Sequence, residues 1–92
     1  MIRSFKHNGL AKFFKSGSTV GIQAAHAKRL QLILGRLNAA SDVKDMDLTG
    51  LRLHQLSGNR AGIWSVTVSG NWRVTFRFEN GDAEIVNYED YH

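Results

Sequence analysis

The sequence predicts an α+β fold in which two N-terminal helices pack on a small antiparallel sheet. Before Ser41 the apolar residues recur at helical spacing, whereas after Gly50 they alternate with polar residues, as in half-buried strands. Asn-Gly and similar pairs readily adopt the positive φ angles of a tight hairpin. Two such turn sequences separate the alternating runs: Ser69-Gly70-Asn71 and Asn80-Gly81-Asp82.

The first elements expected along the chain are a short strand and a short helix. The segment Ile2 to Phe5 begins and ends with an apolar residue, which indicates a short strand. Leu10, Phe13 and Phe14 then recur at helical spacing. The helix is therefore expected near Lys6 to Phe14.

The second helix has the clearer pattern and is expected over about Gln23 to Asn38. Gly35 lies inside it and costs about 1 kcal/mol relative to Ala, so its last turn is expected to fray. The apolar side chains form a stripe with i, i+3, i+4 and i+7 spacing: Ala24, Ala27, Leu30, Ile33, Leu34 and Leu37.

The rest of the chain is expected to be a connection followed by strands. Ser41 to Gly50 is polar and acidic, and is interpreted as a connection with one helical turn. Leu51 to Leu56 alternates and predicts a strand. Three further strands are expected as an antiparallel meander: Gly62 to Val68, Trp72 to Phe78 and Ala83 to Tyr88.

Size and composition limit the class of protein. The 92 residues suit one domain, residues 1–92, and supply too little apolar material for two cores. The content of 42% hydrophobic and 22% charged residues predicts a packed core. Cysteine is absent, which excludes disulfides and thiolate metal sites. No apolar run approaches the roughly 20 residues of a membrane span, so we expect a cytoplasmic protein without membrane contact.

The net charge of +4 is unevenly distributed. Met1 to Ser41 contains seven basic residues and no Asp or Glu, whereas the remainder contains five basic and eight acidic residues. A positive field favours polyanions, because each neutralised phosphate releases condensed counterions. RNA, DNA and an acidic protein all remain possible partners at this point.

Several side chains suited to metal-free RNA cleavage fall on strands or at the chain end. Arg73 lies on the strand face opposite the aromatic residues, His54 lies in the Leu51 to Leu56 run, and Asp90 and His92 are close to the C-terminus. In such a reaction a base takes the ribose 2′-OH proton, an acid protonates the leaving 5′-oxygen, and a cation stabilises the phosphorane.

Simpler interpretations stand beside the catalytic one. The same His and Arg residues are also what a solvated sheet face contains. A metal site on His54, Asp90 and His92 is set aside, because the sequence predicts no ligand geometry for it. His7 and His26 are expected to be surface or boundary residues. Aromatic residues on apolar faces are expected in the core: Trp64, Trp72, Phe76 and Phe78.

Ordered blocks over nearly the whole chain resemble the HigB host-inhibition toxins of the RelE superfamily. These blocks and the terminal Glu-Asp-Tyr-His are far more specific than any single pair of histidines. The blocks are Ile2-Arg3-Ser4-Phe5-Lys6-His7, Gly9-Leu10, Leu53-His54-Gln55-Leu56, Asn59 to Val66, Asn71 to Phe76, Gly81-Asp82-Ala83 and Tyr88 to His92.

The resemblance implies the RelE-like microbial ribonuclease fold and the toxin of a type II toxin-antitoxin system. Such a toxin is a metal-independent, cofactor-free endoribonuclease that enters the ribosomal A site, cuts the exposed mRNA codon and inhibits translation. A helix-turn-helix antitoxin encoded beside it would oppose it, and operator DNA would be bound only through the antitoxin complex.

The resemblance also implies which residues act. His92 is expected as general base or acid with help from His54, Asp90 as the residue that orients a histidine, Tyr91 as a contact to nucleotide or phosphate, and Arg73 as the cation that stabilises charge. The expected RNA and ribosome contacts are Arg3, Lys6, Lys12, Lys15, Arg60 and Asn71, the last of which matches a position that touches a codon base.

One departure and two alternatives accompany this interpretation. Family members often carry Lys where this chain has Ser57, and Arg60 is the nearby cation that would replace it. The first alternative is a non-catalytic RNA- or protein-binding module with the same fold. The second is a DNA-binding repressor, but the chain lacks a helix-turn-helix pair that ends in a recognition helix, so DNA reading is assigned to the partner.

Overall fold

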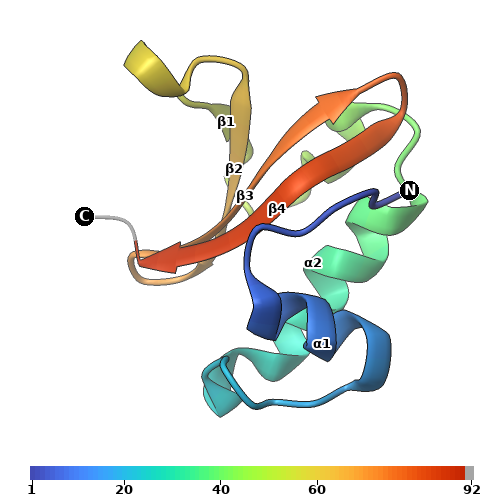
Figure 1. Ribbon diagram of the computed structural model, residues 1–92. Coiled ribbons are helices and arrows are strands. Elements are labelled where there is room, and N and C mark those ends of the chain that lie inside the picture. The colour runs from blue at the N-terminus through green and yellow to red at the C-terminus, as the bar shows by residue number, and fades with distance from the viewer. Residues whose placement is uncertain (91–92) are drawn as a thin grey trace.

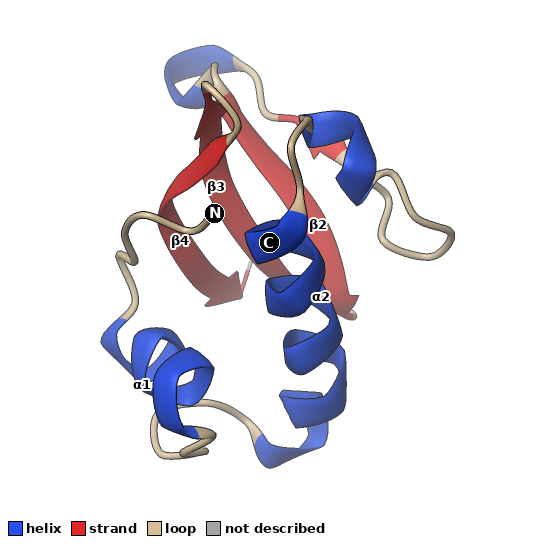
Figure 2. Cartoon of the chain, turned by 90° about the vertical axis from the view of Figure 1, so that its right-hand side faces the viewer, coloured by secondary structure: helices blue, strands red, loops and turns tan. Residues whose placement is uncertain are grey.

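The computed structural model describes residues 1–90, which form two α-helices and an antiparallel sheet of four strands in the order β1-β2-β3-β4. The helices lie together on one side of the sheet (Figures 1 and 2). This confirms the predicted α+β class. The elements are α1 (Asn8–Ser16), α2 (Ala27–Ala39), β1 (His54–Gln55), β2 (Ile63–Ser69), β3 (Trp72–Glu79) and β4 (Asp82–Asp90), with short 3-10 turns at Ala24–His26, Val43–Met46 and Gly58–Arg60.

Both helices are close to where the apolar spacing predicts them. The His7 side chain caps α1, because its Nδ1 accepts a hydrogen bond of 3.0 Å from the Leu10 N–H. Gly17 ends α1 in the left-handed conformation with φ +78°. In α2, Gly35 does not shorten the helix, which continues to Ala39. The expected fraying is therefore absent, and buried Leu34 lies directly beside the glycine.

Two predicted strands are shorter than expected. Ile2 to Phe5 forms only isolated bridges beside β4 in the described structure, from Ile2 to Ala83 and from Phe5 to Val86. The strand predicted over Leu51 to Leu56 is reduced to β1. Its start is interrupted because Arg52 has a positive φ of 51°, which extended backbone does not tolerate. The other three strands and the single turn in the acidic connection agree with the prediction.

The core fills the space between the helices and one face of the sheet. Phe76 is fully buried, and Trp64, Trp72 and Phe78 pack against the core, as predicted. None of the helices in the described part of the chain is long and apolar enough to cross a bilayer. The main buried side chains from the helices and the sheet are Leu10, Leu30, Ile33, Leu34, Leu37, Val66, Val74, Phe76, Val86 and Tyr88. In the described part of the chain, no α-helix covers the opposite face of the sheet, which is called the open face below (Figure 2).

Candidate functional site

A row of four polar side chains crosses the open face from one edge of the sheet to the other. The strand register pairs His54 on β1 with Ser65 on β2, Ser65 with Thr75 on β3, and Thr75 with Asn87 on β4. Directly paired residues point to the same face of a sheet. The sheet therefore places an exposed imidazole at the end of a polar row.

His54 makes one hydrogen bond that bears on its chemistry. Its Nδ1 lies 3.0 Å from the carbonyl oxygen of Arg52. A carbonyl oxygen only accepts hydrogen bonds, so this contact favours the neutral tautomer with the proton on Nδ1. In that tautomer Nε2 carries the lone pair, and the exposed ring can accept a proton there.

Arg73 belongs to the next row of the open face, where the register pairs it with Thr67 on β2 and Glu89 on β4. Its Nη1 donates to the carbonyl oxygens of Gly70 at 2.6 Å and of Trp72 at 3.1 Å. The guanidinium thus bends toward the β2–β3 hairpin, which also contains the exposed Asn71.

His54 and Arg73 share the open face but are not in contact. They are two strand spacings apart across the sheet and two residues apart along it, which corresponds to roughly 12 Å between their Cα atoms.

Asp90 occupies a different position. It is the last residue of β4 and pairs with Trp72, so the alternation of side chains assigns it to the helix-covered face, opposite His54 and Arg73. β4 and β1 are also opposite edges of the sheet, roughly 14 Å apart. The described residues therefore do not bring Asp90 beside His54. Tyr91 and His92, the other two residues expected at the site, lie outside the described residues.

Glu89, which the sequence analysis did not select, is the centre of the polar contacts on the open face. Its carboxylate accepts two hydrogen bonds from Arg60, of 2.8 and 2.9 Å, one from Thr75 Oγ1 at 2.8 Å and one from Asn87 Nδ2 at 3.1 Å. Hydrogen bonding by Arg60, followed by that of Thr75, holds the pKa of Glu89 below its usual value despite partial burial. Its place in the terminal Tyr88 to His92 block was the one sequence signal that pointed to it.

A cavity of about 140 Å³ opens beside this network on the open face. The N-terminal segment contributes Lys6 to it, and the connection after β1 contributes Arg60. Lys6 and Arg60 thus lie at the same hollow as polar groups of β3 and β4, and the charge of Arg60 is balanced by its ion pair with Glu89. Its lining residues are Lys6, Arg60, Ile63, Thr75, Ile85 and Asn87.

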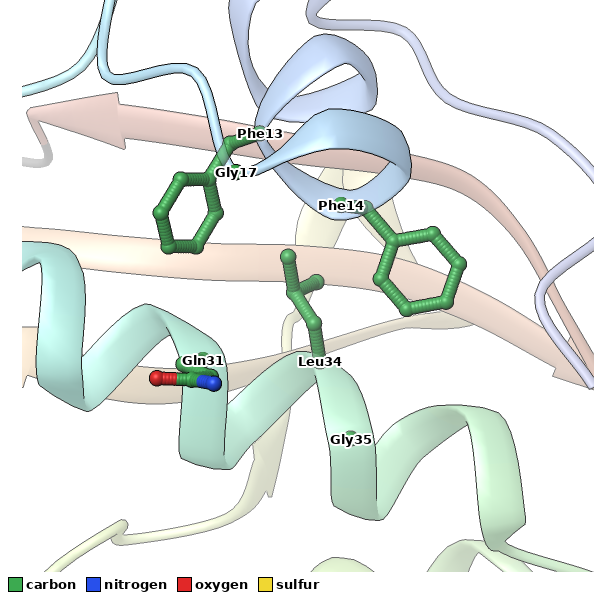
Figure 3. A pocket seen from close by; sticks show the side chains of 6 residues that line it. All are labelled: Phe13, Phe14, Gly17, Gln31, Leu34 and Gly35. Atoms are coloured by element: carbon green, nitrogen blue, oxygen red, sulfur yellow. The ribbon is translucent and has the colours of Figure 1, made fainter.

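A larger hollow of about 410 Å³ lies between the two helices (Figure 3). Phe13 and Phe14 of α1 face Leu34 of α2 across it, and Gln31 is its polar side chain. Since no charged side chain lines it, this hollow is not suited to holding a phosphate. The candidate residues His54 and Arg73 lie on the open face, away from this hollow.

Comparison with known proteins assigns the chain to a family. Residues 3–92 match the model of the HigB-like toxins, described as RelE-like toxins of the type II toxin-antitoxin system HigB. The chain is also 47% identical to "Endoribonuclease HigB" of Proteus vulgaris over 92 residues, which cover 100% of both proteins. The chain belongs to the HigB-like toxin family. As a type II toxin, it has an antitoxin as its partner.

In this HigB-like toxin, His26 is buried, contrary to the predicted surface or boundary position, whereas His7 is half-buried and agrees with that prediction. His7 caps α1, as described above. His26 is 7% exposed, and its Nδ1 lies 2.6 Å from the Tyr88 hydroxyl oxygen. Trp72 stacks on Tyr88 with 4.6 Å between ring centroids. The helical spacing could not reveal a partner that lies 62 residues away in the sequence.

The cations expected to bind RNA occupy several parts of the toxin. Lys12 and Lys15 are exposed on α1, and Lys6 lines the cavity of the open face. The Nε of Arg3 donates to Asp82 at 3.0 Å, so its charge is partly neutralised. Arg60 forms an ion pair with Glu89 at 2.8 Å.

Proposed function

We propose that this HigB-like toxin is a ribosome-dependent endoribonuclease that cuts mRNA in the ribosomal A site and so inhibits translation. The observation that carries the proposal is the full-length identity of 47% to a protein named Endoribonuclease HigB. The open face adds physical support, because it combines an exposed imidazole, an arginine and a cation-lined cavity. These groups suit cleavage without a metal ion or cofactor. Residues 1–92 would act together as a single toxin domain.

His54 is the proposed general base. Its contact with the Arg52 carbonyl favours the tautomer in which Nε2 accepts a proton, as the attack of the ribose 2′-OH requires. Arg73 would stabilise the phosphorane by turning from its carbonyl partners toward the phosphate. Asn71, exposed in the neighbouring hairpin, would contact a codon base.

The C-terminal residues complete the proposed mechanism. His92 would donate the proton to the leaving 5′-oxygen, Tyr91 would hold the nucleotide or the scissile phosphate, and Asp90 would orient a histidine. This assignment rests on the resemblance of the terminal block, since Asp90 and His54 lie on opposite edges of the sheet.

The proposed partners follow from the same activity. The antitoxin would be a helix-turn-helix protein, and operator DNA would be bound only by the toxin-antitoxin complex. The toxin would work in the cytoplasm on ribosome-bound mRNA, with Arg3, Lys6, Lys12 and Lys15 facing rRNA.

Mapping mRNA 5′ ends after induction of the toxin tests the proposal. Ribosome-dependent cuts are expected for the wild type, and His54→Ala or His92→Ala should reduce the cleavage rate by roughly 10²- to 10⁴-fold through loss of acid–base catalysis. Gln55→Ala is the matched control, because it changes the exposed neighbour of His54 on the same strand and should leave the cuts unchanged. Growth arrest without any cuts would contradict the enzyme and favour a non-catalytic binding module.

A further inference from the structure

Arg60 and Glu89 form a bidentate ion pair on the open face. Both terminal nitrogens of the guanidinium bond to separate oxygens of the carboxylate, at 2.8 and 2.9 Å. Such bidentate pairs define orientation as well as distance. Thr75 and Asn87 donate to the same carboxylate, so both partners and their neighbours form one network.

This network joins the two edges of the sheet. Arg60 ends the 3-10 turn that follows β1, the strand of His54, and Glu89 lies on β4 directly before Asp90. The two residues are 29 positions apart in the sequence, and Thr75 in the intervening strand β3 is bonded to the same carboxylate. Thr75 is only 2% exposed although it belongs to the open face, so the network shields the centre of the sheet from solvent.

We propose that the Arg60–Glu89 pair is a positioning clamp, which holds the β1 segment with His54 at a fixed place relative to the end of β4. The inference rests on the proposed ribonuclease function, whose candidate residues His54 and Asp90 lie on the two strands that the clamp joins. Arg60 is thereby a positioning residue that acts through Glu89, and its expected role as a direct RNA contact is replaced.

Enzyme kinetics separate the clamp from direct RNA binding. Glu89→Gln keeps the side chain's size but removes the charge that both Arg60 nitrogens need. A clamp predicts that kcat falls by about 10- to 100-fold, because a displacement of about 1 Å costs that much, while KM stays within about twofold. If Arg60 binds RNA directly, Glu89→Gln would instead release it for the phosphate and lower KM, and that result would overturn the inference.

The partner substitution gives a second measurement. Arg60→Lys keeps the charge but loses the bidentate geometry, so it should lower kcat as Glu89→Gln does. The double variant Glu89→Gln/Arg60→Lys should have a kcat no lower than that of either single variant, because the two residues act as a unit. Additive losses would show two independent roles and contradict the clamp. Glu84→Gln, the same change on the same strand, is the control and should leave kcat unchanged.

Amide hydrogen exchange of the full-length protein tests the clamp without any cleavage assay. Glu89→Gln should speed exchange by about 10-fold or more both in residues 54–60 and at the end of β4, whereas faster exchange in β4 alone would contradict a contact between the edges. Wild-type toxin without ribosome-dependent cuts would sink the nuclease proposal, and the exchange result would still decide the clamp. Normal kcat together with faster exchange would show a contact that is structural only and would overturn the positioning role.

The pH dependence of exchange provides a third readout. The cations near the carboxylate are Arg60, the cross-strand neighbour Arg73 and Lys6 at the same cavity. Because the pKa of Glu89 is lowered, the clamp is fully present above the ordinary Glu pKa of about 4.3 and is lost as the pH falls through the lowered value. Corrected for intrinsic exchange rates, protection of residues 54–60 should fall in that acidic range in the wild type and should not change there in Glu89→Gln.

Discussion

At the scale of single residues, the helix-covered face contains a buried contact between a side chain of the 3-10 turn before α2 and one of β4. The hydroxyl of Tyr88 lies 2.6 Å from Nδ1 of His26, and both residues are buried. His7 and Trp72 pack their rings against Tyr88, the first edge-on and the second stacked. A buried polar atom that loses its partner destabilises the fold by the cost of its desolvation.

Tyr88→Phe is therefore expected to lower the free energy of unfolding by about 1–3 kcal/mol, because it leaves His26 without its partner. Urea denaturation measures this change. His26→Leu combined with Tyr88→Phe removes both polar groups and should recover part of the loss. If Tyr88→Phe were as stable as the wild type, the hydroxyl would contribute no net stability.

The same residue predicts a pH dependence of stability. Burial raises the pKa of Tyr88, so the stability of the wild type should fall as the pH rises above about 10, whereas Tyr88→Phe should lack that contribution.

At the scale of elements, two glycines of the helical layer differ in whether a side chain can replace them. Gly35 lies in the middle of α2, and a Cβ added there would meet nothing within 4 Å. Gly17 ends α1 with a φ of +78°, which side chains with a Cβ rarely adopt. Both glycines line the hollow between the helices (Figure 3).

Gly35→Ala is expected to raise the free energy of unfolding by about 1 kcal/mol, since Ala has the higher helix propensity and the site is open. Gly17→Ala is the matched variant and should lower it by about 1 kcal/mol, because of its left-handed conformation. Both values come from chemical denaturation. A loss of stability in Gly35→Ala would mean that the neighbouring helix α1 approaches this position more closely than the structure has it.

At the scale of the whole molecule, the charges separate by region. α1 carries the exposed Lys12 and Lys15 without a nearby acid on its own element, whereas Lys44 lies among the acidic residues of the connection after α2. The pairing of Arg3 with Asp82 reduces the contribution of that arginine. The positive field that attracts a polyanion is therefore assigned chiefly to Lys12 and Lys15 of α1.

Replacing Lys12 and Lys15 by Ala is expected to weaken binding to purified ribosomes and to flatten its salt dependence. Each lost phosphate contact changes the slope of log K against log salt by about 0.7, so two contacts change it by about 1.4. Titrations at several salt concentrations measure the slope. Lys44→Ala is the control, because it makes the same Lys→Ala substitution outside α1 and should leave the salt slope unchanged. An unchanged slope in the double variant would exclude α1 from the RNA contact.

The sequence alone determined the features that depend on local spacing. The period of the apolar residues predicted both helices, and the alternation with its turn residues predicted the β2–β4 meander and the outward position of Arg73. Periodicity carries this information because backbone geometry fixes which neighbours share a face. The ordered blocks of residues also pointed to the HigB-like family, which the family model confirms.

Only the tertiary structure decided which distant side chains meet. Glu89 contacts Arg60 across 29 positions, and His26 contacts Tyr88 across 62. The same packing separates His54 from Asp90, at opposite edges of the sheet, although both belong to the blocks of the family. Such pairs depend on how the strands align and how the helices dock, and no local pattern encodes that distance.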